Sequence, residues 1–291
     1  MFRDLGSSSQ KQPTGLFLRA VFVLHIVVSV NIAIFENLWY FGQVKKIYIY
    51  GKHAVREALM HAPGLVKEIH ISPQMDDDKI RELIRKLKIP TSGIDVRKVS
   101  SQVERGAPHQ GVIALISLTA LAIPFEKFIE GFTPAPDSLL VVISEVQDPH
   151  NVGAIIRSAA AFGAAAVLMP THKQAPITGT AIKVSAGMAF RVPLVTMENM
   201  QQALGLLKKK GVHIYGLEAG SENSISDEQF GGPTVLVLGN EAEGLTPAAR
   251  ALCEKMLSIP IDARAESLNV AASAAVALYS YREKITHPHI D

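Results

Sequence analysis

The chain has 291 residues, a length that fits two domains or one large one. Hydrophobic residues make up 48% of it, which is ample for a packed core, and apolar runs that alternate between strand and helix periods predict an α/β fold. Cys253 is the single cysteine, which excludes a disulfide framework and a cysteine-rich zinc site and fits a reducing compartment such as the cytoplasm.

The charge is unevenly distributed, although the formal net charge is only +2. Residues 45–117 contain 13 Lys and Arg against 8 Asp and Glu, whereas residues 138–291 contain 12 against 14. A basic region beside a slightly acidic one indicates that the basic region meets a polyanion. A surface of solvated lysines would account for the same counts, so charge alone does not decide.

The first 46 residues form an N-terminal extension with one hydrophobic segment, 16–41. The segment is apolar over 20–35, but His25, Ser29 and Asn31 interrupt it, and the uninterrupted run is shorter than the roughly 20 residues that a bilayer span needs. Basic residues precede it, so a signal anchor is one alternative. We expect instead a non-native extension, for example from an upstream start codon, or an extra surface helix, and no membrane anchor.

Residues 47–117 are expected to form a small α/β/α sandwich. Strand-like runs alternate there with two amphipathic helical segments. The expected strands are 47–50, 66–71, 95–99 and 112–116, and the expected helices are 52–62 and 77–89. A proline-containing linker, 118–137, follows and includes an amphipathic segment, 125–132.

Residues 138–285 predict a second, larger α/β domain. Its first strand, 139–143, is almost entirely apolar, as is typical of strands buried on both faces. The alternation of elements predicts a mainly parallel sheet covered by helices. The further expected strands are 165–169, 213–217, 234–238 and 256–261, and the expected helices are 151–162, 200–209 and 268–284.

Several common catalytic motifs are missing from the chain. It has no G-x-G pair, so the dinucleotide-binding fingerprint is absent, and it has no P-loop, zinc-protease or hydrolase nucleophile motif. A cofactor bound at this sheet would therefore need a different cradle.

Two polar turns follow strands of the expected sheet. In the first, Asn151 is well placed to cap the following helix, Gly153 permits close approach, and Arg157 falls off the apolar stripe toward a rim. In the second, Glu241 and Glu243 lie in a glycine-bounded turn. A helix cap, a solvated arginine and solvated loop carboxylates explain these residues without any function. Polar turns at strand ends are, however, where ligands of open α/β folds bind.

A third polar segment, Ser267-Leu268-Asn269, opens the last expected helix, with Ser267 as its N-cap. Together, NVGAIIRSAAAFG from Asn151, LVLGNEAEGL from Leu236 and MLSIPIDARAESLNV from Met256 resemble the SpoU/TrmH branch of the SPOUT RNA 2′-O-methyltransferases. The resemblance spans 47–284. It implies a SPOUT α/β-knot domain with a deep trefoil knot, S-adenosylmethionine as methyl donor without a metal, an RNA substrate and a homodimer.

The resemblance also implies roles for individual residues. It assigns catalytic positions to Asn151, Arg157, Glu241, Ser267 and Asn269, and cofactor contacts to Leu238, Gly239, Ile259 and Leu268. Because a guanidinium stays protonated in ordinary settings, we expect Arg157 to anchor RNA phosphate rather than act as a general base.

Two motifs of the small domain indicate the substrate. YGKHAVREAL from Tyr50 and HQGV from His109 resemble the substrate-binding module of large-subunit (23S-type) rRNA guanosine 2′-O-methyltransferases, whose fold is like a kink-turn-binding ribosomal protein. Within the enzyme class, a tRNA 2′-O-methyltransferase is the competing hypothesis. Outside that class, the chain could be a non-catalytic RNA-binding or ribosome assembly factor of the same fold, or a membrane-anchored protein with an unrelated soluble domain.

Overall fold

The computed structural model describes residues 46–94, 109–118 and 121–286. Contacts divide the chain into two units, Met1–Val44 and Lys45–Asp291. The hydrophobic segment 16–41 and the predicted strand 95–99 lie outside the described residues. Within the described ranges, no helix is both long enough and apolar enough to cross a membrane.

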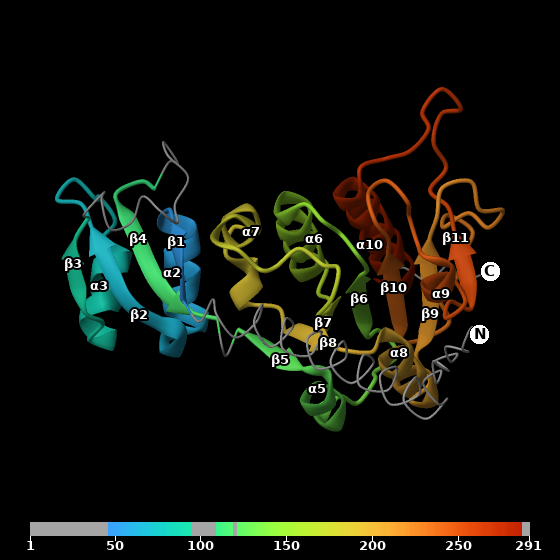
Figure 1. The fold of residues 1–291 in the computed structure, drawn as a ribbon, viewed down its shortest axis with the longest axis horizontal. Coiled ribbons are helices and arrows are strands. Elements are labelled where there is room, and N and C mark those ends of the chain that lie inside the picture. The colour runs from blue at the N-terminus through green and yellow to red at the C-terminus, as the bar shows by residue number, and fades with distance from the viewer. Residues whose placement is uncertain (1–45, 95–108, 119–120, 287–291) are drawn as a thin grey trace, which may run out of the picture. The chain divides into compact units, whose positions relative to one another are not determined.

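The N-terminal part of the larger unit forms a four-stranded sheet in the order β1-β4-β2-β3 (Figure 1). Strand β4 pairs antiparallel with β1 and β2, and β3 pairs parallel with β2. The strands are β1 Lys46–Tyr50, β2 Val66–Ile71, β3 Thr91–Gly93 and β4 Val112–Ser117. The short, exposed strand β3 was not predicted, because its Thr-Ser-Gly sequence carries no apolar alternation.

Two helices, α2 (Lys52–His61) and α3 (Asp78–Leu87), pack against each other beside this sheet. Helix α3 begins where the Asp77 carboxylate accepts a hydrogen bond from the Ile80 N–H at 3.0 Å, and it ends at Lys88 in the left-handed conformation. A short 3₁₀ turn, η1 (Pro63–Leu65), links α2 to β2. Both helices and the strands β1, β2 and β4 lie close to the bounds that periodicity predicted.

The C-terminal part forms a seven-stranded sheet in the order β11-β9-β10-β6-β7-β8-β5 (Figure 1). Every pair in this sheet is parallel, so the prediction of a mainly parallel sheet is confirmed. The strands are β5 Ala122–Pro124, β6 Leu139–Ile143, β7 Ala166–Pro170, β8 Leu194–Met197, β9 His213–Leu217, β10 Thr234–Leu238 and β11 Lys255–Leu257. The helices are α5 Phe125–Gly131, α6 Pro149–Ala161, α7 Gly179–Val184, α8 Met200–Lys209, α9 Pro247–Arg250 and α10 Val270–Thr286, with a 3₁₀ turn, η2, at Met188–Phe190.

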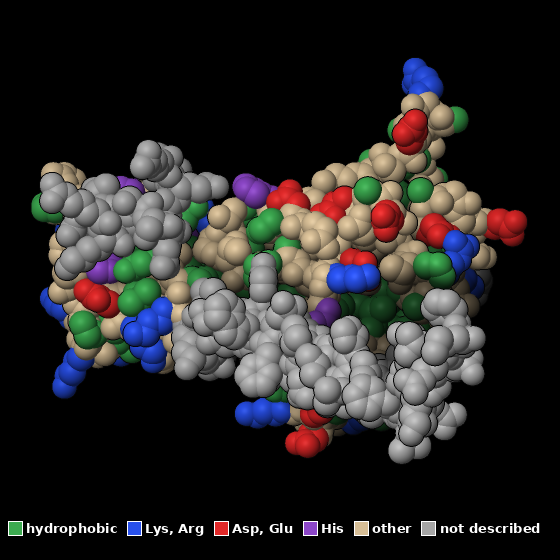
Figure 2. Space-filling view, in the orientation of Figure 1, with side chains coloured by type: hydrophobic (Ala, Val, Ile, Leu, Met, Phe, Trp, Pro, Cys, Tyr) green, Lys and Arg blue, Asp and Glu red, His purple; other side chains and the backbone are tan. Residues whose placement is uncertain are grey.

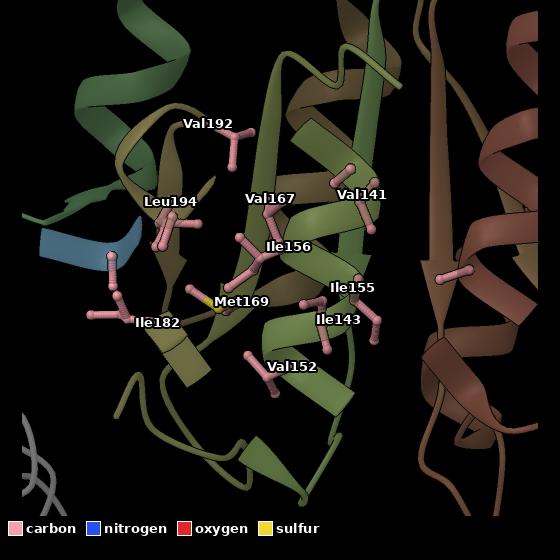
Figure 3. Close-up of a cluster of buried hydrophobic side chains, with 14 of the residues drawn as sticks. Val141, Ile143, Val152, Ile155, Ile156, Val167, Met169, Ile182, Val192 and Leu194 are labelled. Atoms are coloured by element: carbon pink, nitrogen blue, oxygen red, sulfur yellow. The ribbon is translucent and has the colours of Figure 1, made fainter. Parts of the chain in front are cut away.

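The central strand β6 separates two hydrophobic cores. Leu139, Val141 and Ile143 face the core under α6 and α10, whereas Leu140 and Val142 face the core under α8 and α5. Figure 3 shows α6 directing an apolar stripe onto β6 and β7, and the residues it labels there include Val152, Ile155, Ile156, Val141 and Val167. An all-apolar strand is required here because side chains alternate between two buried faces.

The segment predicted as a linker, 118–137, is not simply a connection. Its residues Ala122–Pro124 form the edge strand β5, which pairs parallel with β8, and its amphipathic part forms α5. Pro124 is tolerated because β5 lies at the edge of the sheet. Part of the predicted linker is therefore an edge strand followed by a helix.

Strands β6 and β10 are neighbours at the point where the order of connections reverses. The chain runs from β6 through α6 to β7 on one side, whereas β10 and β9 lie on the other side. At such a switch point the loops after neighbouring strands diverge and leave a crevice at the carboxyl edge, which is where open α/β sheets bind ligands. The loops after β6 and β10 are those that carry the predicted polar turns.

Candidate functional site

Glu241 in the turn after β10 joins that turn to the turn after β6. Its carboxylate accepts hydrogen bonds from the backbone N–H groups of Gln147 and Asp148, each at 3.2 Å. Asn240 supports the same junction, since its Nδ2 donates to the Glu145 carbonyl at 2.8 Å. The two turns at the switch point are therefore held by side chains of the GNEAEG segment.

Asn151 and Asn269 extend this junction into a chain of three side chains. Asn151 Nδ2 donates to Glu241 Oε1 at 3.0 Å, and Asn269 Nδ2 donates to Asn151 Oδ1 at 3.0 Å. Asn269 is itself held by the backbone of α10, because its Oδ1 accepts from the N–H groups of Ala271 and Ala272. Three segments far apart in the sequence thus meet at the carboxyl edge of the sheet.

Two helix caps differ from the predictions. Helix α6 begins at Pro149 and its N-cap is Asp148, whose carboxylate accepts from the His150 N–H at 2.8 Å, so Asn151 lies inside the first turn. Proline fits the first helical position because it has no N–H to satisfy. Helix α10 is capped by Asn269, and Ser267 lies before it in the exposed segment that leads to the helix. Because Asp148 and Asn269 are the caps, the Asn151 side chain and the Ser267 hydroxyl are not used for capping.

The environment of Glu241 keeps its carboxylate ionised. Partial burial alone would raise the pKa of Glu241, but hydrogen bonds from Asn151 and from backbone N–H groups outweigh it and hold the pKa below its ordinary value. Since its oxygens are engaged by three donors, Glu241 is arranged to hold the two turns together rather than to exchange a proton.

A cavity of about 300 Å³ opens beside this junction. All four residues predicted to contact the cofactor line it, and so do Glu241 and Ser267. The lining residues with a predicted role are Leu238, Gly239, Glu241, Ile259, Ser267 and Leu268. Asn151 and Asn269 do not line the cavity, but Glu241 links them to its rim.

Gly239 is required by the tight turn after β10. A Cβ atom at this position would lie 2.2 Å from the carbonyl carbon of Gly244 and 2.5 Å from the Leu245 nitrogen. Asn240 and Gly244 close the turn through two backbone hydrogen bonds, of 2.8 and 3.0 Å. Glycine is therefore the residue that lets the chain fold back and expose backbone groups to the cavity.

Arg157 lies on the exposed side of α6, six residues beyond Asn151. On an ideal helix this separates the two positions by about 9 Å along the axis and places them on different faces. No hydrogen bond or ion pair joins Arg157 to the Asn151 chain among the described residues. Its participation in the site stays a prediction.

Several cavity residues were not predicted from the sequence. The end of β9 and the turn after it contribute Leu217, Glu218 and Ala219, and the end of β11 and the segment after it contribute Leu257 and Ile261. The sequence did contain a pattern that could have identified the first of these segments. Strand β9 is also followed by a glycine-bearing turn, at Gly220, and it ends at the same edge of the sheet. Strand β11 ends at Leu257, earlier than predicted, since Pro260 lacks the N–H that pairing would need.

Acidic side chains surround the cavity. Glu218 and Glu243 line it together with Glu241, and Figure 2 shows Asp and Glu side chains gathered over the region of β10, α10 and β11. Within the described ranges, no group of three His, Cys, Asp or Glu side chains is arranged to hold a metal ion. Glu218 is paired with Arg250, so Glu241 and Glu243 are the carboxylates that make the rim negative, which disfavours direct contact with RNA phosphates.

Two family profiles match the chain. The SpoU rRNA Methylase family matches residues 138–279, which contain the cavity, and the family described as RNA 2′-O ribose methyltransferase substrate binding matches residues 48–119. The match boundaries follow the two sheets, with β5 and α5 between them.

Named relatives cover most of the chain. The 23S rRNA (guanosine-2′-O-)-methyltransferase RlmB of Xanthomonas axonopodis pv. citri is 36% identical over 238 residues, which are 80% of this chain and 94% of that protein. The protein of the same name from Neisseria meningitidis serogroup B is 32% identical and covers 81% of this chain and 94% of its own. The solved structure of the SpoU methyltransferase AviRb from Streptomyces viridochromogenes in complex with AdoMet has a similar fold, with a TM-score of 0.73 and 24% identity over 84% of this chain and 92% of its own.

These matches agree with the all-parallel sheet, the switch-point cavity and the separate N-terminal sheet described above. The chain belongs to the SpoU rRNA methylase family.

Proposed function

We propose that the protein transfers a methyl group from S-adenosylmethionine to the ribose 2′-hydroxyl of a guanosine in large-subunit rRNA. The observation that carries the proposal is the hydrogen-bonded chain Asn269–Asn151–Glu241, which ends at the rim of the cavity lined by the candidate cofactor residues. The names of the relatives, each a 23S rRNA (guanosine-2′-O-)-methyltransferase, favour this substrate over tRNA.

The cavity fits the methyl donor. Its volume of about 300 Å³ is within the range of small-molecule sites. Leu238, Ile259 and Leu268 offer apolar surface, and Gly239 leaves the backbone of the turn accessible. When bound, S-adenosylmethionine supplies a methyl group on a positively charged sulfur, and the acidic rim suits that charge. We therefore propose that these residues bind the cofactor.

The amide N–H groups of Asn151 and Asn269 are the hydrogen-bond donors that could face the substrate. Each amide nitrogen has two hydrogens, and one hydrogen of each is used within the chain of three side chains. One N–H of each residue remains to face a ribose oxygen, where it would stabilise the negative charge that develops as the hydroxyl loses its proton. Glu241 positions Asn151, and the Ser267 hydroxyl at the cavity rim is the further polar group near the reacting oxygen.

RNA binding is proposed to involve the exposed cations of α3. Five exposed cationic side chains lie on or directly after this helix, and within the described ranges none of them forms an ion pair with a carboxylate. They are Lys79, Arg81, Arg85, Lys86 and Lys88. Exposed cations without a carboxylate partner suit the phosphates of RNA, whereas the acidic cavity rim does not. Arg157 is proposed to add a phosphate contact near the site.

A second copy of the chain is proposed to cover α10. Val276 and Tyr279 on this helix are large apolar residues that are 40% and 59% exposed. They suit a homodimer interface beside the site. Sedimentation analysis of Tyr279→Glu tests this, with Tyr279→Phe as control: the first variant should be a monomer, and an unchanged dimer would contradict the interface. A cytoplasmic location follows from the proposed rRNA substrate.

The substrate is tested with the purified full chain and S-adenosylmethionine carrying a labelled methyl group. Protein-free large-subunit rRNA, small-subunit rRNA and tRNA are offered separately. Label in large-subunit rRNA supports the proposal. Label in tRNA alone would establish the alternative substrate, and cofactor binding without transfer to any RNA would indicate a non-catalytic RNA-binding factor.

A further inference from the structure

Glu57 on α2 and Arg191, directly after η2, join the four-stranded sheet unit to the seven-stranded one. Arg191 Nε donates to Glu57 Oε2 at 2.5 Å, and Arg191 Nη2 donates to Glu57 Oε1 at 3.0 Å. The Glu57 side chain is only 13% exposed, and the hydrogen bond from Arg191 holds its pKa below the ordinary value. A two-point contact of this kind fixes orientation as well as distance.

The backbone around Arg191 also rests directly on the small unit. A Cβ on Gly179 would lie 2.4 Å from the Tyr48 carbonyl oxygen on β1, and a Cβ on Gly187 would lie 2.5 Å from the Cβ of Glu57. Between these two glycines, Lys183 Nζ lies 4.4 Å from the centre of the Tyr50 ring. The segment 179–191, which contains α7 and η2, therefore fits closely against β1 and α2.

The same segment contacts the helix that carries Asn151. A Cβ on Gly153 of α6 would lie 2.4 Å from the Ala181 carbonyl oxygen of α7. Ile182 of α7 packs into the core under α6, where Figure 3 shows it near Met169. Helix α7 thus touches the small unit on one side and α6 on the other. Because packed interiors do not deform continuously, the position of the small unit is tied to that of α6.

We propose that the Glu57–Arg191 pair and segment 179–191 lock the RNA-binding unit to the catalytic unit and so determine which ribose reaches Asn151 and Asn269. This inference rests on the proposed methyl transfer and extends it to the selection of the target nucleotide. Glu57 and Arg191 are positioning residues that act through the placement of the RNA, since neither lines the cavity.

The test is a charge-reversal cycle in the full-length protein. Glu57→Arg and Arg191→Glu are each expected to reduce kcat on large-subunit rRNA by about 100-fold, the size of effect that a misplaced reacting group produces. Both should leave the Kd for S-adenosylmethionine unchanged. The double variant restores an ion pair of opposite polarity and should recover most of the lost rate, because the two residues act as a coupled pair.

The positions of 2′-O-methyl groups on the product RNA should also be mapped. A general loss of stability would lower the rate but would not change these positions. The single variants are expected to mark additional riboses near the natural target, and the double variant should return to one position. Lys208→Glu is the matched control, since Lys208 forms an exposed pair with Glu254 within the seven-stranded unit. If a charge reversal prevents folding, Arg191→Gln and Glu57→Gln remove the pair without creating repulsion.

The outcomes separate the two proposals. Single variants with wild-type kcat and an unchanged methylation site would overturn the positioning role while leaving the proposed function intact. A wild-type protein that binds S-adenosylmethionine but methylates no RNA would overturn the proposed function and the positioning role with it.

Discussion

The Asn151 amide nitrogen donates a hydrogen bond of 3.0 Å to one oxygen of the Glu241 carboxylate, although the two residues are 90 positions apart in the sequence. The same carboxylate accepts two backbone N–H groups from the turn that opens α6. One side chain therefore fixes both the start of the helix and the direction of the Asn151 amide.

Replacing Glu241 by Gln should disrupt this arrangement without changing its size. The new NH2 group would face donors where the carboxylate had accepted, and because Glu241 is exposed to water each lost hydrogen bond costs about 0.5–1.5 kcal/mol. We expect a lower melting temperature and a fall in kcat of at least about 10-fold from the loss of Asn151 orientation. Glu222→Gln, an exposed glutamate in another loop, should behave as wild type. Equal activity of Glu241→Gln and wild type would show that the turn is held by other contacts.

Acid should weaken the same junction. The folded-state pKa of Glu241 is lowered, so its contribution to stability is fully present above the unfolded-state pKa, which is about 4.3. The contribution is lost as the pH falls through the folded-state pKa. The difference in free energy of unfolding between wild type and Glu241→Gln should therefore be constant near neutral pH and shrink below about pH 4. Denaturant melts at several pH values measure it, and a difference that grows in acid would contradict the assignment.

Gly239→Ala should abolish cofactor binding. The added methyl group would overlap the backbone of Gly244 and Leu245, and backbone cannot move aside as a flexible side chain can. Calorimetric titration with S-adenosylmethionine should detect no binding. Gly205→Ala is the matched control, because nothing lies within 4 Å of its Cβ position in α8, and a helical alanine should add roughly 0.5–1 kcal/mol of stability. Cofactor affinity retained by Gly239→Ala would remove this turn from the cofactor site.

The cations of α3 should appear in the salt dependence of RNA binding. Each phosphate contact contributes a slope of about −0.7 to −0.9 to the plot of log K against log salt concentration. Replacing Lys79, Arg85 and Lys86 together by Ala should reduce the slope by about 2 to 3 and leave the Kd for S-adenosylmethionine unchanged. Substitution of exposed Lys127 and Lys209 on α5 and α8 is the control. An unchanged slope in the α3 variant would place the RNA contacts elsewhere.

Much of the fold was predictable because its central strands are short apolar runs between turn residues. The strand bounds 139–143, 213–217 and 234–238 and the helix bounds 200–209 agree with the structure. The edge strand β5, its neighbour β8 and helix α7 were missed, since each is short and β5 contains a proline. The two caps were misassigned because nearby residues, such as Asp148 and Asn151, are equally good cap formers and only the backbone decides.

The site was only partly predictable. The three polar turns carry recognisable residues, but their hydrogen bonds span 90 and 118 positions, and no local pattern encodes such pairings. The contact between Glu57 and Arg191 spans 134 positions and was missed for the same reason. The trefoil knot implied by the resemblance concerns how the chain is threaded, which periodicity does not report, and it stays a prediction.

Asn151 and Asn269 are proposed to serve a ribose 2′-oxygen beside a methyl donor in the adjacent cavity. The most direct test is nucleoside mass spectrometry of large-subunit rRNA treated with wild-type protein or Asn151→Ala and labelled S-adenosylmethionine. We expect labelled 2′-O-methylguanosine with wild type and none with Asn151→Ala, although the variant should still bind the cofactor. Label on a nucleobase, or near-wild-type 2′-O-methylation by Asn151→Ala, would contradict the proposal.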